Sequence, residues 1–232
     1  MNHTAEKLLT FIKESPTAFQ AVEMMKKRFT ENGFTELSEE EHWELQGGGK
    51  YFVIRNHSAL IAFTLPEEES DVFHIIASHS DSPSLKIKEN PEMVENGYVK
   101  LNVELYGGAL LAPWFDRPLS VAGRLIVKEN GEIREKLVTV EQDMLMIPNL
   151  AIHMNREANS GYKYNVQKDM LPVYGLESAK GSFFKVVAEA AGVKEDDVLG
   201  HDLFLYNPMP GTIWGGEDAF VSAPRLDDLQ CA

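Results

Sequence analysis

Ser120–Val140 reads SVAGRLIVKENGEIREKLVTV, and this stretch decides the fold of the middle of the chain. Two runs, Ser120–Val127 and Glu132–Val140, flank the pair Asn130-Gly131. Asn-Gly between two such runs is a strong hairpin signal, because both residues adopt the left-handed backbone that a two-residue turn requires. The stretch therefore predicts two antiparallel strands.

The neighbouring sequence extends this pattern in both directions. Upstream, Val99, Leu101, Val103 and Leu105 alternate with polar residues, which predicts another strand with one solvated face. Downstream, 181–191 has helical spacing and is closed by Gly192, and 202–206 is a short strand before a turn-rich stretch at 207–217. The middle of the chain is thus mainly antiparallel β structure with a helix.

The N-terminal part of the chain has a different pattern of apolar residues, with helical periodicity first and strand signals after it. Apolar residues at helical spacing predict one helix over 4–14 and a second that starts near Pro16 and stops at Gly33. Strands follow at 51–54 and 59–65. The run 73–78, FHIIAS, is short and mostly apolar, as expected of a strand buried on both faces. An α/β domain interrupted by an inserted domain explains this order.

Composition excludes several classes of function. The chain has 232 residues, 44% of them hydrophobic, and a formal net charge of -14. Such an acidic surface repels phosphate backbones, so a nucleic acid is not an expected partner. No stretch is apolar enough for a membrane span, and the single cysteine, Cys231, fits a reducing compartment. We therefore expect a cytoplasmic protein.

His79 and Asp81 follow the apolar run, in SHSDSP at 78–83. Residues two apart in an extended chain face the same way, so the carboxylate can accept one imidazole N–H while the other nitrogen binds a metal. The alternative is a loop histidine hydrogen-bonded to a turn carboxylate. In α/β proteins, ligands bind at the carboxyl ends of the sheet strands. Because His79 and Asp81 follow a predicted buried strand, the metal-ligand hypothesis and the alternative are about equally favoured.

Two further sites remain ambiguous from spacing alone. Asp227 and Asp228 stand at a loop-to-helix junction, where they could bridge metal ions but where helix capping is the more frequent role of Asp. His153 lies in a mostly apolar run, where a histidine is more often a hydrogen-bonded core residue than a functional one. Neither pattern is decisive by itself.

The ordered set of motifs resembles the aspartyl aminopeptidase and vacuolar aminopeptidase I family of zinc metallopeptidases. The resemblance covers essentially the whole chain, and the ordered set is specific where one motif would be weak. The motifs are Ser15-Pro16-Thr17-Ala18-Phe19, His79-Ser80-Asp81-Ser82-Pro83, Tyr106-Gly107-Gly108, Trp114-Phe115-Asp116-Arg117, the His153 segment, and Ala223-Pro224-Arg225-Leu226-Asp227.

The resemblance implies a fold and a reaction. It implies an α/β metallopeptidase domain, formed by 1–84 and 209–232, interrupted by a mainly antiparallel β dimerisation domain at 85–208. The reaction would be release of N-terminal residues from peptides by a homo-oligomer, often a dodecamer built from dimers. Two Zn²⁺ ions per active site are implied, although His and carboxylate ligands also suit Co²⁺ or Mn²⁺. Preference for acidic residues is left open.

The resemblance also implies roles for individual residues. His79 looks like a ligand of one zinc, Asp81 like the catalytic residue that orients it, and Asp227 like the carboxylate that bridges both metals. His153 would act catalytically in a neighbouring subunit's site, with a place among the metal ligands as the less favoured assignment. Asp228 departs from the pattern, because relatives usually carry Asn there.

Other parts of the family's site have no counterpart in this sequence. The Glu-Glu pair that supplies the general base, a further Asp and the last His would lie beyond residue 232, so we expect an N-terminal portion that is inactive by itself. Two competing hypotheses remain: a non-catalytic oligomerisation module built on 85–208, and a related metal-dependent deacylase.

Overall fold

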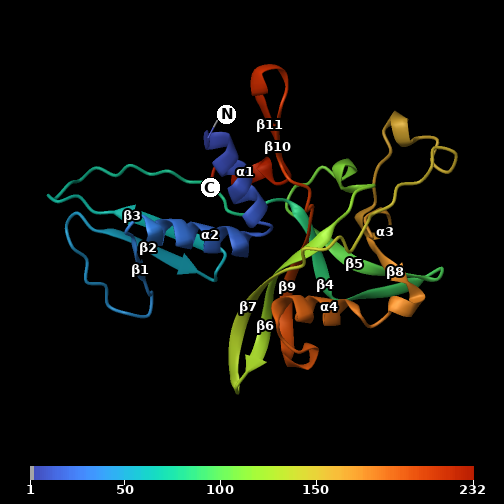
Figure 1. The fold of residues 1–232 in the computed structure, drawn as a ribbon, viewed down its shortest axis with the longest axis horizontal. Coiled ribbons are helices and arrows are strands. Elements are labelled where there is room, and N and C mark those ends of the chain that lie inside the picture. Colours follow the sequence, from blue (N-terminus) through green and yellow to red (C-terminus); the bar gives the residue numbers. More distant parts are fainter. Residues whose placement is uncertain (1–2) are drawn as a thin grey trace. The chain divides into compact units, whose positions relative to one another are not determined.

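The computed structural model describes residues 3–232, which form two compact units. The first unit is Met1–Ser82 together with Pro210–Ala232, and the second unit is Pro83–Met209. Figure 1 shows the elements, which are α1 (His3–Glu14), α2 (Ala18–Glu31), β1 (Thr35–Leu37), β2 (Lys50–Arg55), β3 (Ala59–Thr64), β4 (Ser84–Glu95), β5 (Tyr98–Tyr106), β6 (Ser120–Glu129), β7 (Glu132–Thr139), α3 (Val166–Asp169), β8 (Val173–Leu176), α4 (Phe183–Ala191), β9 (Val198–Tyr206), β10 (Thr212–Trp214), β11 (Phe220–Ser222) and α5 (Leu226–Leu229).

The first unit contains a small mixed sheet and helices. Strand β1 pairs with β2 in parallel, and β2 pairs with β3 antiparallel. Helix α2 packs on this sheet through Phe29, whose ring stacks on that of the fully buried Phe52 at 6.1 Å between centroids. Both expected helices are confirmed, and Gly33 follows α2 with φ of 80°, a left-handed conformation that favours glycine and stops a helix.

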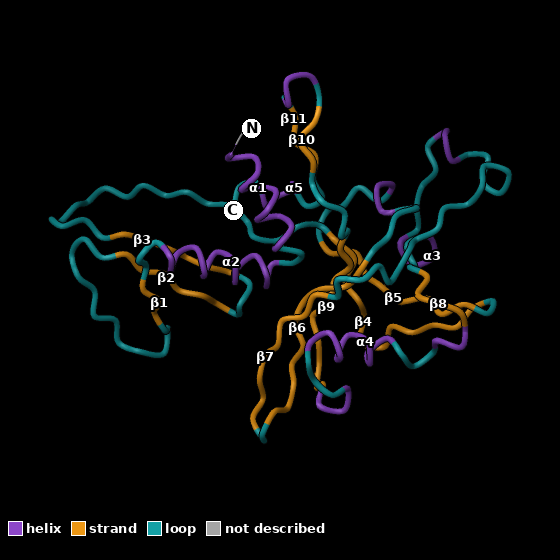
Figure 2. Tube along the Cα trace, viewed as in Figure 1, coloured by secondary structure: helices purple, strands orange, loops and turns teal. Residues whose placement is uncertain are grey.

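The prediction of a buried strand at 73–78 is wrong. No strand is present between Leu65 and Pro83, and Figure 2 shows these residues as a long loop. Phe73, Ile75 and Ile76 are 83%, 84% and 97% exposed. A strand needs neighbours that accept its backbone hydrogen bonds, and the described sheet of this unit ends at β3. Local apolar composition gives no information about whether such a neighbour exists.

The second unit is built on a six-stranded antiparallel sheet with the order β7-β6-β9-β4-β5-β8. The expected hairpin is confirmed, because β6 and β7 pair from Ala122–Thr139 down to Glu129–Glu132. Asn130 and Gly131 join them with φ of 54° and 86°, the left-handed values that the turn requires. The mixed α/β class with mainly antiparallel pairing is also confirmed.

The core of the second unit lies between the sheet and α4. Phe183 and Val187 of α4 are fully buried, together with residues from four strands, among them Leu101, Leu125 and Leu203. Each large side chain of this kind contributes about 1.5–3 kcal/mol when it is fully buried. The alternation seen in the sequence therefore corresponds to one packed face of the sheet.

Strand β4 is absent from the sequence-based expectations. Its pairing with β5 is interrupted between Ile87 and Glu92, and the four residues 88–91 (KENP) lie in this irregularity. The alternation of apolar residues is broken there, so a period-two pattern does not reveal the strand. The turn after it, Asn96-Gly97, has φ of 52° and 81° and carries the same signal as Asn130-Gly131.

The turn-rich stretch expected at 207–217 contains more order than predicted. Strand β10 pairs with β11 as a two-stranded ribbon, and the rings of Trp214 and Phe220 lie 5.0 Å apart on it.

Within residues 3–232, none of the helices has both the length and the apolar character needed to cross a membrane.

His201, on β9 opposite Leu125, has an unusual environment. Both of its ring nitrogens are buried and have no hydrogen-bond partner among the described residues, and its ring lies 5.1 Å from that of Phe184. Burial lowers the pKa of His201. Nearby Lys86 adds to this effect, whereas Glu89 and Asp202 oppose it. The folded protein therefore favours the neutral imidazole.

This environment predicts acid sensitivity of the second unit. The unfolded chain binds a proton at His201 near the ordinary pKa of 6.5, above the folded value, so stability is lost as pH falls below about 6.5. In the His201→Phe variant this part of the loss should disappear. Hydrogen exchange of β6 and β9 amides between about pH 7 and pH 5, corrected for intrinsic rates, measures it. The exposed His42→Gln variant is the control, and equal pH slopes for all three proteins would contradict the prediction.

Candidate metal centre

His79 lies in the loop that follows β3, and three contacts of this loop fix its position. The Ser80 hydroxyl donates to the carbonyl of Ser58, at 3.0 Å, in the turn between β2 and β3. His79 Nδ1 lies 2.9 Å from Asp81 Oδ1. The backbone N–H of Asp228 approaches the carbonyl of Asp81 at 3.5 Å. The expected pairing of His79 with Asp81 is therefore present, in a loop and not at the end of a strand.

The other ring nitrogen of His79 is directed to a second carboxylate. Nε2 lies 2.9 Å from Asp228 Oδ2. The hydrogen bond to Asp81 raises the pKa of His79, and the charges of Asp228 and Asp81 act in the same direction, against partial desolvation. The imidazole side chain stays 57% exposed, so the site is open to solvent and to ligands.

Asp227 and Asp228 are held by packing at the C-terminal end of the described chain. Leu229 is 1% exposed in a cluster with Phe11, Ile12 and Ala21. Arg225 Nη2 donates to the carbonyl of Ile12 at 2.8 Å. Helices α1 and α2 thus anchor both sides of the Asp227-Asp228 pair, and this pair is connected by a cis peptide bond.

The capping alternative for the two aspartates does not hold. The N-cap position of α5 is Arg225, and both aspartates lie after it with backbone angles that are not helical. Their carboxylates instead face His79. Donor atoms of His79, Asp227 and Asp228 all lie within 4.8 Å of one another, and within 3–232 no other group of three His, Cys, Asp or Glu residues meets this criterion.

This donor set fits zinc. Imidazole nitrogen and carboxylate oxygen bind Zn²⁺ at about 2.0–2.2 Å, which places tetrahedral ligands about 3.3 Å apart. The three groups need only small side-chain shifts to reach that separation. Catalytic zinc sites combine three protein ligands with an open position for water or substrate, which matches the number of donors and their exposure.

His153 is not part of this group. It lies in the second unit, in an exposed turn within 148–157, so the alternative of a buried core histidine is wrong. The residues before it are anchored by Asp116, from the Trp114-Phe115-Asp116-Arg117 motif. The backbone N–H of Asp116 donates to the Ile147 carbonyl at 3.0 Å, and the Asp116 carboxylate accepts the N–H of Asn149 at 2.8 Å.

Comparison with known proteins identifies the family. A family model described as aminopeptidase I zinc metalloprotease, M18, matches residues 11–232. The chain belongs to the M18 family. The suspected resemblance is confirmed, and the match includes every donor of the candidate metal centre.

Individual M18 relatives agree with this result. A probable M18 family aminopeptidase 2 of Clostridium acetobutylicum is 47% identical over 235 residues, covering 97% of this chain and 54% of that protein. Among solved structures, mApe1 of Chaetomium thermophilum has a TM-score of 0.86 at 33% identity, covering 97% of this chain and 55% of that one. The S. cerevisiae mApe1 dodecamer has 0.79 at 29%, covering 97% and 53%. The chain spans about half the length of the relatives it matches.

The packing of α5 predicts how the metal centre is positioned. Leu229→Ala would leave a cavity beside Phe11 and Ile12 and lower the unfolding free energy of the first unit by about 2–5 kcal/mol. Because Leu229 directly follows the two aspartates, zinc affinity should fall as well. Denaturant unfolding and calorimetric zinc titration measure the two effects. Leu229→Met, which keeps the volume, should restore both, and unchanged stability in the alanine variant would refute this account.

Proposed function

We propose that the protein supplies three of the metal-binding residues of an M18 aminopeptidase active site. His79 would hold a zinc ion through Nε2, and Asp227 and Asp228 would supply carboxylate oxygens to the same group. The observation that carries this proposal is the convergence of these donors, which are separated by about 150 residues in sequence, in a chain whose family is described as zinc metalloproteases.

Asp81 has a distinct part in this proposal. It accepts the Nδ1 proton of His79, which fixes the tautomer and leaves the Nε2 lone pair directed to the metal. Such a hydrogen bond also raises the basicity of the ligand nitrogen. Asp81 is therefore a positioning residue, and the bound metal is held through His79.

The proposed reaction is hydrolysis of the N-terminal peptide bond. Zinc at this centre would polarise the scissile carbonyl and lower the pKa of the attacking water. The acidic side chains around His79 favour a cationic group, which suits the free α-amino group of a peptide substrate. The family match favours peptides over acylated amino acids. Preference for acidic residues, the number of metals and a cytoplasmic location stay predictions.

Zinc titration by calorimetry tests the assigned ligands without requiring activity. The unmodified chain should bind zinc, and His79→Ala and Asp227→Ala should each lose measurable binding because a direct donor is removed. Asp81→Asn should weaken binding about 10–100-fold, as expected for a residue that acts on a ligand.

His74→Ala is the matched control, since His74 is exposed in the same loop and lies outside the donor group. It should bind zinc as the unmodified chain does. Equal affinity of the His79→Ala variant and this control would overturn the assignment.

We also propose that the second unit mediates self-association, the dimerisation role expected of the inserted domain. Leu150, Ile152 and Met154 lie close to His153 in sequence and are 62%, 47% and 75% exposed. An exposed apolar cluster of this kind marks an interaction surface. Association through it would bring His153 next to another subunit, as its proposed catalytic role requires.

Sedimentation velocity tests the association. The protein should sediment as a dimer or a larger assembly, and Ile152→Asp with Met154→Asp should shift it to monomer because two charges enter the apolar contact. Ile61→Asp, at a 71% exposed position on β3, provides a control of the same chemistry. A monomer in all three proteins would contradict the proposal, while zinc binding would still test the metal centre separately.

A further inference from the structure

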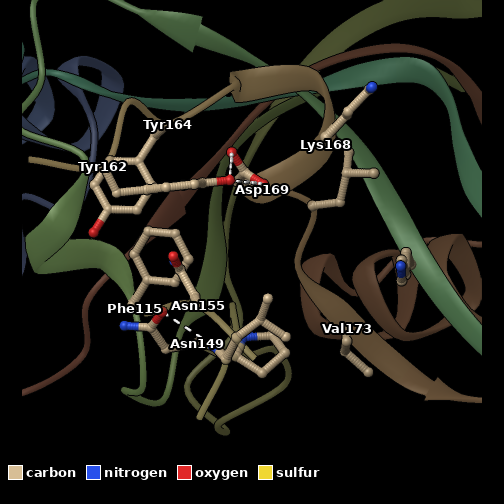
Figure 3. Close-up of a pocket in the computed structure, with 12 residues that line it drawn as sticks. Phe115, Asn149, Asn155, Tyr162, Tyr164, Lys168, Asp169 and Val173 are labelled. Carbon is tan, nitrogen blue, oxygen red and sulfur yellow. Dashed lines mark hydrogen bonds between the residues drawn. The ribbon is translucent and has the colours of Figure 1, made fainter. Parts of the chain in front are cut away.

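A pocket in the second unit is lined by none of the residues of the donor group described above. It has a volume of about 230 Å³ and is formed between β5, β8, the residues around Phe115 and the segment 148–171. Figure 3 shows the side chains around it.

One side of the pocket is aromatic. The ring of Tyr164 lies 5.0 Å from that of Phe115 and 5.3 Å from that of Tyr162, and the two tyrosine rings meet at 76°. Figure 3 shows the three rings gathered on the same side. The faces of aromatic rings carry the negative part of the ring quadrupole, so a cation within about 6 Å of an exposed ring face on this side is attracted to it.

A carboxylate adjoins these rings. Asp169 accepts hydrogen bonds from the Tyr162 hydroxyl, at 3.3 and 3.4 Å, and from the backbone N–H of Asn165 at 2.6 Å. Burial and the charge of Asp169 raise the pKa of Tyr162, so the phenol stays protonated and donates. The Asp169 charge is thereby fixed beside the aromatic rings.

The two lysines that line the pocket do not neutralise this side. Lys100 Nζ donates to Glu95 Oε2 at 2.6 Å, so its charge is already matched by another carboxylate. Lys168 extends its amino group away from the three rings in Figure 3. The aromatic side of the pocket therefore combines π faces with the negative charge of Asp169.

We propose that this pocket binds an organic cation, an alkylammonium or guanidinium group such as the end of a lysine or arginine side chain. The cation would contact the faces of Phe115, Tyr162 and Tyr164 and lie close to the Asp169 carboxylate. The apolar stem would run along Pro148, Leu171 and Val173, which also line the pocket.

Occupancy of the pocket would also affect the segment that carries His153. Asn149, Leu150 and Asn155 line the pocket and flank His153 in sequence. A ligand that contacts them restricts the motion of the turn between them. The pocket therefore connects cation binding to the order of the His153 turn, independently of the metal centre.

Titration by protein-observed NMR tests the proposal with three probes of matched size. N-acetyl-lysine N-methylamide carries the cation, N-acetyl-norleucine N-methylamide is its neutral analogue, and N-acetyl-glutamate N-methylamide is anionic. The lysine probe should bind at least about fivefold more tightly than the neutral one, as a cation–π contact of roughly 1 kcal/mol provides. n-Butylammonium distinguishes a free amine from a side chain of a polypeptide, and binding of either supports the pocket.

Variants identify the groups that carry the selectivity. Asp169→Asn and Tyr164→Leu should each reduce the preference for the lysine probe, whereas Lys168→Met should leave it unchanged or increase it. The lysine probe should slow hydrogen exchange over 148–157. Equal binding of the cationic and neutral probes, preference for the anionic probe, or no saturation by any probe would overturn the proposal. The zinc titrations test the metal centre only, so their outcome does not affect the test of this pocket.

Discussion

Hydrogen bonding between strand backbones is the constraint on which both units depend. In the second unit, β6 is paired on both sides, with β7 and with β9, and β9 in turn pairs with β4. These pairings fix which side chains face α4 and which face away. In the first unit β1, β2 and β3 pair in one sheet and β10 pairs with β11, whereas the apolar residues 73–76 have no strand partner and remain exposed.

The outward face of the second unit's sheet carries an ion-pair network that also depends on strand register. Arg124 on β6 contacts Glu135 on β7 at 2.9 Å and Asp202 on β9 at 2.8 Å, and Lys86 on β4 reaches Asp202 at 2.8 Å. Burial acts to raise the pKa of Asp202, but the hydrogen bonds from Lys86 and Arg124 outweigh it and the pKa is lowered. A shift of register by one residue would separate all these charges.

The candidate metal centre depends on a different kind of constraint. His79 lies on a loop and the two aspartates lie in α5 with backbone angles that are not helical, so their positions come from contacts of the neighbouring residues. Ser80 attaches the His79 loop to Ser58, and burial of Leu229 holds the aspartates next to it. The same logic applies to the His153 turn, where Asp116 anchors the residues before the histidine. In each case a residue without chemistry of its own determines where a reactive side chain lies.

The sequence by itself determined the elements whose signals are local. Helices α1, α2 and α4 and the hairpin around Asn130-Gly131 follow from periodicity and turn chemistry, and the pairing of His79 with Asp81 follows from their spacing. The family's ordered motifs pointed to Asp227. Only the tertiary structure showed that Asp228 contacts His79 and that His153 is exposed, and only it showed that residues 73–78 are not a strand. These properties depend on partners distant in the chain, and periodicity carries no information about such partners.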